Sequence, residues 1–365
     1  SMSKAPSVVL AGGGTAGHIN PMLAIAREIR RIEPEANILT LGTEDKMEAQ
    51  LVPEAGFDIE FIPRVAFPRS LSLNALTFLP RFAKAISQTR KILKDANADV
   101  VVGVGGYVCP PAYLAAFFSR IPVVIHEANA KPGLANKLGG PLAKFVGVAF
   151  SNTPFPRAKL VGMPMKDEIA HLNRRAARAQ ARHTLGLDPD KPVLIVTGGS
   201  LGAQSLNNAV AENITNFEDW GFQVLHITGK GKAIVDDSGE PVTAPNYRQI
   251  EFSHGMQDVY AAADLLIVRA GAATVSEVAA VGVPAIFVPL PFGNGEQSLN
   301  ARSLVMAEAA LLIEDKKMTG AWFAREIPSL MADAQKLKEM GRRAYKLGIR
   351  DAAHVMAEAT LKVVK

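Results

Sequence analysis

Glu277 is the side chain whose type and spacing point most directly to chemistry. It follows an apolar run over residues 263–268 and a stretch of small residues that would let the backbone approach a ligand. We expect a helix to begin near Thr274 with its hydroxyl as N-cap, which would place Glu277 in the first turn beside unpaired N–H groups. Such N–H groups bind phosphate, and a carboxylate can bind the hydroxyls of ribose, so the pattern predicts a nucleotide-sugar site. The alternative is that Glu277 only completes a capping box with Thr274.

His18 is a second candidate, because it follows the glycine-rich turn of residues 11–17. That turn recurs: residues 13–15 and 198–200 are 185 positions apart (198 − 13), and each follows an apolar run and precedes a helical pattern. The repeat has Ala203 where the first copy has His18, so the turn itself does not need an imidazole. We expect His18 to point from a helix N-terminus into a cleft, where the positive helix end would lower its pKa and keep it a neutral proton acceptor. A purely structural histidine is the alternative.

The elements that would position these residues form two similar halves. Each half begins with a strand, a glycine-rich turn and a helix, which is the first unit of a doubly wound parallel sheet. We predict an α/β protein of two Rossmann-like domains facing a cleft, with residues 1–163 and 164–346 as the domains. The C-terminal helix, about residues 347–365, is expected to pack back on the first domain. The strands are predicted at residues 8–11, 37–41, 100–104, 123–126, 145–149, 194–197, 223–227, 248–252, 265–268 and 285–288.

Composition supports a globular protein with two cores. The chain has 365 residues, a net charge of +5 and a pI near 9.2, which would suit an anionic partner. Cys109 is the only cysteine, so an intramolecular disulfide is excluded and a reducing compartment is expected. No apolar run approaches the ~18 residues of a membrane span.

A basic and apolar segment lies between Arg64 and Lys94 and contains no Asp or Glu. This composition is typical of a surface that lies on an anionic membrane, although a solvated basic helix face is the commoner origin of such a pattern. Nucleic acid is not favoured, because no binding motif accompanies the charge. A second basic run, residues 174–182, is interpreted as a solvated helix face. The predicted membrane contacts are Arg64, Phe67, Arg69, Leu76, Phe78, Leu79, Arg81, Phe82 and Lys84.

Several other activities find little support. The spacing Gly12-x-Gly14-x-x-Gly17 matches a dinucleotide fingerprint, but the second predicted strand does not end in the acidic residue that a dehydrogenase uses for ribose. No cluster of His, Cys, Asp or Glu has metal-ligand spacing, and there is no P-loop. We therefore expect neither a metal nor another cofactor, and keep an NAD(P)-dependent dehydrogenase as a remote alternative.

Five motifs occur in order between residues 8 and 297: the first glycine loop, GVGGY at 103–107, HEAN at 126–129, GGS at 198–200 and the block from Glu277 to Gln297. In these the chain resembles the MurG-type N-acetylglucosaminyltransferases along essentially its full length. The resemblance implies the GT-B fold and inverting transfer of GlcNAc from UDP-GlcNAc to the undecaprenyl-diphosphate-linked muramyl-pentapeptide, lipid I. It also implies a peripheral location on the cytoplasmic face of the plasma membrane, with cell-wall assembly proteins as partners.

The resemblance also implies roles for individual residues. The acceptor diphosphate would meet Gly14, Gly105, Gly106 and Tyr107. Apart from the resemblance, we expect His18 to be the base, with Glu127 as a weaker candidate if it faces the cleft. Lys166 stands where the family usually has an arginine near uracil, and lysine lacks the planar fork. Ala128 and Glu296 also depart from the family pattern. The residues implied to bind substrate are Thr15, Ala16, Gly17, Asn129, Lys166, Ser200, Phe252, Ser253, Ala272, Ala273, Thr274, Val275, Ser276, Glu277 and Gln297.

Other readings remain open. The protein could be another UDP-sugar transferase of the same fold or a UDP-GlcNAc epimerase, both of which need the same donor site. A non-catalytic module that docks on membranes would use only the basic segment. Acceptor-dependent release of UDP distinguishes the transferase from all of these.

Overall fold

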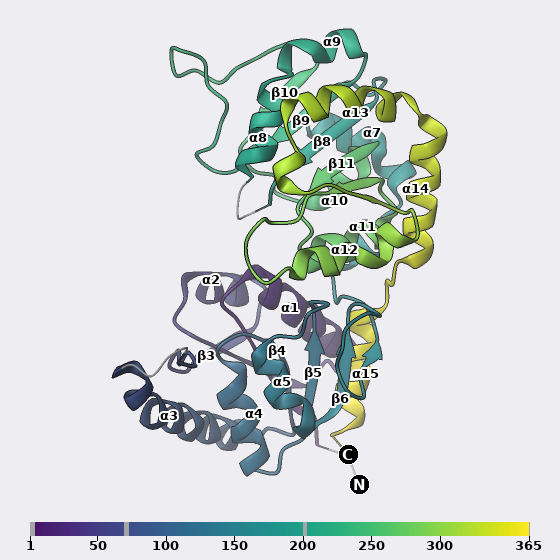
Figure 1. Cartoon of the computed structure of the whole chain (residues 1–365). Coiled ribbons are helices and arrows are strands. Elements are labelled where there is room, and N and C mark those ends of the chain that lie inside the picture. The colour runs from purple at the N-terminus through teal and green to yellow at the C-terminus, as the bar shows by residue number, and fades with distance from the viewer. Residues whose placement is uncertain (1–3, 69–72, 200–202, 365) are drawn as a thin grey trace. The chain divides into compact units, whose positions relative to one another are not determined.

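The computed structural model describes residues 4–68, 73–199 and 203–364. The chain divides into two compact units: the first is Ser1–Met165 with Arg350–Lys365, and the second is Lys166–Ile349. The predicted fold class, two Rossmann-like α/β units as in the GT-B fold, is confirmed, and each unit has an all-parallel sheet (Figure 1). No helix in the described ranges has both the length and the apolar character needed to cross a bilayer.

The sheet of the first unit has seven strands in the order β3-β2-β1-β4-β5-β6-β7. The five strands predicted in this half are confirmed, with β6 shifted toward the N-terminus. Two further strands were not predicted, because β3 is largely exposed and β7 has only two residues. The strands are β1 (Ser7–Gly12), β2 (Asn37–Gly42), β3 (Asp58–Phe61), β4 (Val100–Gly105), β5 (Val123–Glu127), β6 (Ala143–Val148) and β7 (Lys159–Leu160).

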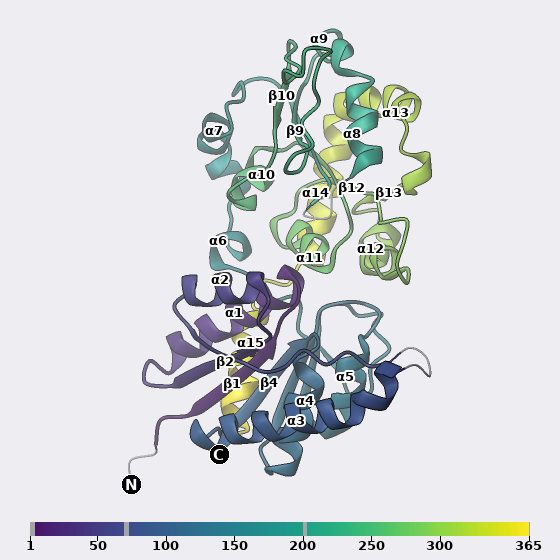
Figure 2. The same cartoon turned by 90° about the vertical axis from the view of Figure 1, so that its left-hand side faces the viewer.

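Successive side chains of β1 point to opposite faces of this sheet and contribute to a core on each face. Val8 and Leu10 pack with α1 and α15, whereas Val9 and Ala11 pack with α4. In Figure 2, α3, α4 and α5 lie on one side of β1 and β4, and α1 lies on the other. The helices are α1 (Ala16–Ile32), α2 (Lys46–Glu54), α3 (Leu73–Asp95), α4 (Cys109–Phe118), α5 (Leu134–Gly139) and α15 (Ala352–Lys362), with a 3₁₀ turn η1 (Gly140–Leu142).

The C-terminal helix α15 belongs to the first unit. It packs against α1, and Met356 is fully buried in the same core as Val8 and Leu10. His354 also lies 2.9 Å from a carboxylate oxygen of Glu28 on α1. The last residues of the chain therefore complete the core of the unit formed by the first residues.

The second unit repeats the arrangement with six strands in the order β10-β9-β8-β11-β12-β13. Its five predicted strands are confirmed, and the two-residue β13 was not predicted. The strands are β8 (Val193–Thr197), β9 (Gln223–Ile227), β10 (Tyr247–Ile250), β11 (Leu265–Val268), β12 (Ala285–Phe287) and β13 (Leu311–Leu312). The helices are α6 (Asp167–Ala170), α7 (Arg174–Thr184), α8 (Gln204–Ala211), α9 (Phe217–Trp220), α10 (Met256–Ala262), α11 (Ala272–Val281), α12 (Glu296–Met306), α13 (Gly320–Ala332) and α14 (Ala334–Leu347), with 3₁₀ turns η2 (Ile214–Asn216) and η3 (Asp315–Lys317).

Candidate functional site

Two glycine loops meet at the carboxyl end of the sheet in the first unit. One joins β1 to α1 and the other follows β4, and the strand order reverses between these two strands. Doubly wound sheets bind their ligands at such a switch point. Gly106 has a φ of +103°, and a Cβ there would lie 2.6 Å from the carbonyl oxygen of Gly13. Glycine is therefore required for the two loops to approach this closely.

His18 lies between the two loops, in the first turn of α1. Its Nδ1 is 3.1 Å from the carbonyl oxygen of Gly13, and the Thr15 hydroxyl is 3.4 Å from the same nitrogen. Its Nε2 faces Gly105, where an added Cβ would lie 2.9 Å from that nitrogen. Burial lowers the pKa of His18, and the hydrogen bond to Gly13 opposes this effect. The direction matches the expectation, but the cause is burial and not the helix terminus.

A cavity of about 250 Å³ opens beside His18 in the first unit. The first glycine loop, Glu48, Arg64 and Tyr107 contribute to its lining. Arg64 was predicted to contact the membrane, but its guanidinium carbon lies 4.5 Å from the centre of the Tyr107 ring, a cation–π contact at the cavity. The lining carries both signs of charge, the Arg64 guanidinium and the carboxylates of Asp45 and Glu48, and the helix N–H groups beside Arg64 could bind an anionic group.

Glu48 is a buried residue of this site that the sequence analysis missed. Its carboxylate accepts hydrogen bonds from the N–H of Gly14 at 2.5 Å and from the N–H of Thr43 at 2.6 Å. The N–H of Gly14, which we had expected to face the acceptor diphosphate, is therefore already engaged. The available signal was the spacing Asp45-x-x-Glu48, which resembles a capping box, although Glu48 caps the glycine loop instead.

Glu127, the weaker candidate base, is instead built into the loop that follows β5. It is almost fully buried, and its two oxygens accept hydrogen bonds from the N–H groups of Asn129 at 3.0 Å and Gly133 at 2.7 Å. Asn136 donates to the same carboxylate at 3.3 Å. A carboxylate held in this way organises the loop that carries the half-buried Asn129, so the geometry argues against Glu127 as the base.

The helix that carries Glu277 begins earlier than predicted. α11 starts at Ala272 with Gly271 as N-cap, so Thr274 is in the first turn and Glu277 is in the second. Glycine is itself an acceptable N-cap, and the two alanines after it are strong helix formers, which overrides the threonine signal. The capping-box alternative is also wrong. Ala272, Ala273 and Thr274 supply the free N–H groups of this terminus.

Glu277 instead forms a polar cluster with Tyr260 of α10 and Lys166, the N-cap of α6. The Tyr260 hydroxyl donates to Oε1 of Glu277 at 2.7 Å. Burial raises the pKa of Glu277 to about 7, while the Tyr260 hydrogen bond and the charge of Lys166 oppose that rise. The second carboxylate oxygen has no hydrogen-bond partner among the described residues and is free to accept from a ligand.

The remaining predicted donor residues fall into three groups. The side chain of Val275 is buried and its N–H donates to the carbonyl oxygen of Gly271 at 3.0 Å, so neither group is available to a ligand. Ser276 is half-buried, and its hydroxyl oxygen has no partner among the described residues. Phe252 is exposed after β10, beside the half-buried Ser253, and Ser200 lies outside the described residues. The side-chain oxygen Oε1 of Gln297 accepts from the N–H groups of Ala270 at 3.1 Å and Leu290 at 3.0 Å, which leaves the side-chain amide nitrogen for a ligand.

An ion pair that the sequence analysis did not identify supports this donor region. Arg269, at the carboxyl end of β11, lies 2.6 Å from Asp315, and the Ser205 hydroxyl of α8 donates to the same oxygen of Asp315 at 2.5 Å. Arg269 also donates to the carbonyl oxygen of Val288 at 3.2 Å. These contacts join β11, β12 and α8 at the switch point of the second sheet, between β8 and β11.

The predicted membrane segment forms α3 and the chain before it. Phe67, Phe78 and Phe82 contact one another with ring centres 5.2 to 5.7 Å apart, so they form a small cluster instead of projecting singly. Leu76 and Leu79 do project, with 77% and 71% of their surfaces exposed, and Arg81 and Lys84 are exposed on the same helix. Arg69 lies outside the described residues. Exposed Phe117 and Phe118 at the end of α4, which packs on α3, were not predicted.

The second basic run was interpreted as a solvated face, and this is wrong for two of its arginines. Arg174 donates to the carbonyl oxygens of Tyr260, Ala263 and Gly282, and Arg182 forms an ion pair of 2.9 Å with Asp264. These side chains cap the carboxyl end of α10.

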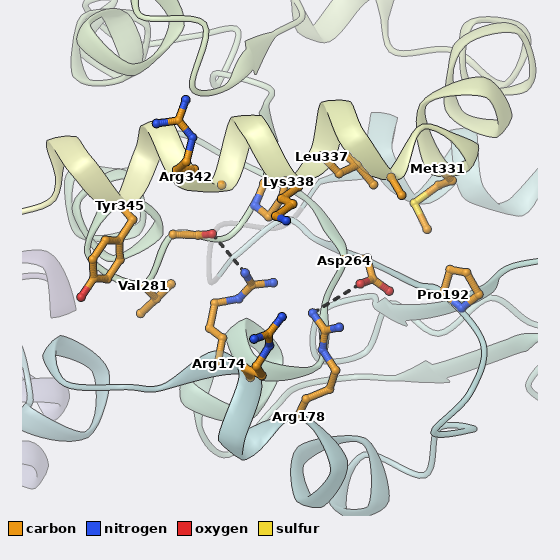
Figure 3. A pocket seen from close by; sticks show the side chains of 15 residues that line it. Arg174, Arg178, Pro192, Asp264, Val281, Met331, Leu337, Lys338, Arg342 and Tyr345 are labelled. Atoms are coloured by element: carbon orange, nitrogen blue, oxygen red, sulfur yellow. Dashed lines mark hydrogen bonds and ion pairs between the residues drawn. The ribbon is translucent and has the colours of Figure 1, made fainter.

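A cavity of the second unit lies beside this run and is separate from the donor residues. It has a volume of about 790 Å³ and lies between α7 and α14 (Figure 3). Pro192 and Asp264, in its lining, directly precede β8 and β11. The cavity is therefore at the amino end of the sheet, whereas Arg269 and α11 follow the carboxyl end.

Comparisons with known proteins cover both units. Residues 8–148 match the glycosyltransferase family 28 N-terminal domain, and residues 193–356 match the glycosyltransferase family 28 C-terminal domain. The solved structure of Acinetobacter baumannii MurG is similar over 98% of this chain and 100% of that one, with a TM-score of 0.80 and 30% identity. A Neisseria meningitidis UDP-GlcNAc 2-epimerase bound to UDP-GlcNAc has a TM-score of 0.66 at 15% identity, which shows a shared fold alone.

Two curated relatives have the same name, UDP-N-acetylglucosamine–N-acetylmuramyl-(pentapeptide) pyrophosphoryl-undecaprenol N-acetylglucosamine transferase. The protein of Paenarthrobacter aurescens is 54% identical over 99% of this chain and 97% of its own length. That of Clavibacter sepedonicus is 46% identical over 96% of this chain and 94% of its own length. Such identity over nearly the whole of each chain means that this protein is a glycosyltransferase and belongs to the MurG family of N-acetylglucosamine transferases.

Proposed function

We propose that the protein transfers GlcNAc from UDP-GlcNAc to the muramyl 4-hydroxyl of lipid I, giving lipid II for peptidoglycan synthesis. The observation that carries the proposal is Glu277, a half-buried carboxylate beside the free N–H groups of α11, in a chain matched end to end by proteins named for this reaction. Supply of lipid II would link the protein to cell-wall growth, and through it to cell shape and division.

The donor half of the site lies in the second unit. The free oxygen of Glu277 would accept from the ribose hydroxyls, and the N–H groups of Ala272, Ala273 and Thr274 would bind the diphosphate. Phe252 and Ser253 would lie against uracil, with Lys166 nearby, and Ser276 would contribute its unpaired hydroxyl. Ser200, which precedes α8 in the sequence, would also bind the diphosphate. The amide nitrogen of Gln297 would donate to a GlcNAc hydroxyl.

The acceptor half lies in the first unit. The N–H groups of Thr15, Ala16 and Gly17 at the start of α1 would bind the lipid diphosphate, with Arg64 opposite them in the 250 Å³ cavity. Gly105, Gly106 and Tyr107 would form the facing wall, and Asn129 would contact the transferred sugar. Gly14 would contribute its backbone conformation, since its N–H is held by Glu48.

The reaction would be one inverting displacement at the anomeric carbon. The muramyl 4-oxygen forms the new bond to that carbon as the bond to the β-phosphate oxygen of UDP breaks, and the electron pair leaves with UDP. The proton of the 4-hydroxyl passes to Nε2 of His18. Helix N–H groups, rather than a metal cofactor, would stabilise the charge on UDP.

A UDP-GlcNAc epimerase is the main alternative, because a solved epimerase shares the fold. An experiment that separates the two measures UDP released from UDP-GlcNAc with and without a short-chain lipid I analogue. The proposal predicts release only with the analogue. Release or epimerisation of UDP-GlcNAc alone would favour the epimerase, and reduction of NAD(P)⁺ without uridine dependence would favour the dehydrogenase.

The same proposal places the protein on the cytoplasmic face of the membrane, held peripherally by α3 and in reach of cell-wall assembly proteins. Leu76 and Leu79 would enter the interface, with Arg81 and Lys84 near anionic headgroups. Replacing both leucines by glutamate should reduce sedimentation with phosphatidylglycerol vesicles at least tenfold. Leu160→Glu, at another exposed leucine of the first unit, is the matched control. Equal sedimentation of both variants would remove α3 from the membrane contact.

A further inference from the structure

Glu48 is a buried carboxylate for which the reaction described above has no use. Only 1% of its surface is exposed, although it lies in the first turn of α2 beside the acceptor cavity. Its hydrogen bonds of 2.5 and 2.6 Å bring the N–H of Gly14, after β1, and that of Thr43, after β2, to one side chain. Charged hydrogen bonds of this length hold their partners firmly. Glu48 therefore fixes the first glycine loop against the neighbouring strand end.

The loop that Glu48 fixes also holds the candidate base. The peptide group between Gly13 and Gly14 donates its N–H to Glu48. The carbonyl oxygen of the same peptide group, which belongs to Gly13, is 3.1 Å from Nδ1 of His18. Because a carbonyl oxygen can only accept, this contact requires the proton to be on Nδ1. The Thr15 hydroxyl at 3.4 Å can accept from the same N–H. Nε2 is then unprotonated, and it is the nitrogen that faces Gly105.

The two contacts sit on opposite atoms of one peptide group. The N–H of the Gly13–Gly14 peptide points to Glu48, and its C=O points to His18. A peptide group is planar and turns as one body. An ionised carboxylate on one side therefore fixes the direction of the carbonyl on the other, and a hydrogen bond to one ring nitrogen selects the histidine tautomer.

We propose that Glu48 is a positioning residue for His18, acting through the Gly13–Gly14 peptide to keep Nε2 unprotonated and aimed at the acceptor site. This rests on the proposed function for the role of His18 as base, but the tautomer can be observed without any substrate. Titratable or charged groups near Glu48 come from three other elements and its own: His18 of α1, Arg64 after β3, Tyr107 after β4 and Asp45 at the start of α2.

Nitrogen NMR of the His18 ring in the full-length protein tests the proposal first, because it separates a protonated from an unprotonated ring nitrogen. The expected result in the wild type near pH 7.5 is a proton on Nδ1 and none on Nε2. Glu48→Gln should replace this single tautomer by a mixture, since the amide can accept only one of the two N–H groups. Glu54→Gln, an exposed carboxyl on the same helix, should keep the wild-type spectrum. An unprotonated Nδ1 in the wild type, or an unchanged ring spectrum in Glu48→Gln, would overturn the proposal.

Kinetics then test the consequence for transfer. Glu48→Gln should lower kcat about 10- to 100-fold, with the KM for UDP-GlcNAc within about twofold of the wild type. A looser loop admits water, so the pKa of His18 rises toward its ordinary value and the acid limb of the kcat profile moves to higher pH. An unchanged kcat and pH profile would contradict the proposal. If the wild type itself shows no transfer, the proposed function fails, while the ring spectra still decide the role of Glu48.

Discussion

Glu277 and His18 are the two side chains on which the proposed chemistry depends. Burial raises the pKa of Glu277 and lowers the pKa of His18, so it favours the neutral form of each. Both could be identified from residue type and spacing, because His18 follows a glycine-rich turn and Glu277 follows a stretch of small residues, each near the start of a predicted helix. The spacing Asp45-x-x-Glu48 indicates at most a capping residue, and the role of Glu48 at the glycine loop could not be predicted, because its partners, Gly14 and Thr43, are brought to it only by the pairing of β1 with β2.

Removing the Glu277 carboxylate should weaken donor binding. Glu277→Ala is expected to cost about 1.5–3 kcal/mol of UDP-GlcNAc binding for each charged hydrogen bond that is lost. Calorimetric titration measures the effect, with Glu218→Ala, an exposed carboxyl of the second unit, as the control. A change below a few tenths of a kcal/mol would remove Glu277 from the ribose contact.

The pKa of about 7 for Glu277 gives donor binding a pH dependence. Ribose hydroxyls donate to the ionised form, so the Kd for UDP-GlcNAc should rise as the pH falls below 7, by up to about tenfold per pH unit.

The same pKa gives the stability of the protein a pH dependence. The folded state retains the Glu277 proton between pH 4.5 and about 7, so the Glu277 contribution to the free energy of unfolding decreases as the pH rises through that window. Both trends should be absent in Glu277→Gln, and a Kd independent of pH in the wild type would contradict the assignment.

Loss of the His18 ring should affect turnover and spare the donor. His18→Ala is expected to lower kcat by about 10²–10⁴ if His18 is the base. UDP-GlcNAc affinity should be unchanged, and His171→Ala, at an exposed histidine, should behave as the wild type. Because the pKa of His18 is lowered, wild-type kcat should fall only below the ordinary histidine range near pH 6.5. Retention of most activity in His18→Ala would return the residue to a structural role.

At the scale of elements, the contact between the two glycine loops should be sensitive to one methyl group. Gly106→Ala would place a Cβ 2.6 Å from the Gly13 carbonyl oxygen, at a φ of +103°. Gly56→Ala adds similar backbone strain at a φ of +87° but meets no atom within 4 Å. We expect Gly106→Ala to raise the KM for a lipid I analogue at least tenfold and to leave the KM for UDP-GlcNAc unchanged. Equal effects of the two substitutions would show that strain alone, and not loop contact, matters.

Most of the elements could be predicted, for an identifiable reason. Parallel strands that are covered on both faces consist mostly of apolar residues. The strands β1, β4, β8 and β11 could therefore be predicted from apolar runs in the sequence. Strands β3, β7 and β13 were missed because they are exposed or only two residues long. The N-cap of α11 was placed three residues late, at Thr274 instead of Gly271, because glycine competes with threonine for this role.

At the scale of the whole molecule, the chain returns to its first unit to complete a core. Met356 of α15 is fully buried with β1 and α1, whereas Met306 of α12 is 72% exposed. Met356→Ala should destabilise the first unit by about 2–5 kcal/mol, and Met306→Ala should change stability by less than about 0.5 kcal/mol. Hydrogen exchange would localise the loss to residues 4–165 in the first case. Faster exchange in the second unit instead would contradict the assignment of α15.

In the proposed function, donor and acceptor residues in two similar units serve one transfer reaction. This can be tested by the mass and the anomeric configuration of the product that the wild-type protein forms from UDP-GlcNAc and a short-chain lipid I analogue. We expect one added N-acetylhexosamine, a β-linkage to the muramyl 4-oxygen and one UDP released for each product. An α-linkage would contradict the single displacement, and UDP released without a disaccharide product would contradict the transfer itself.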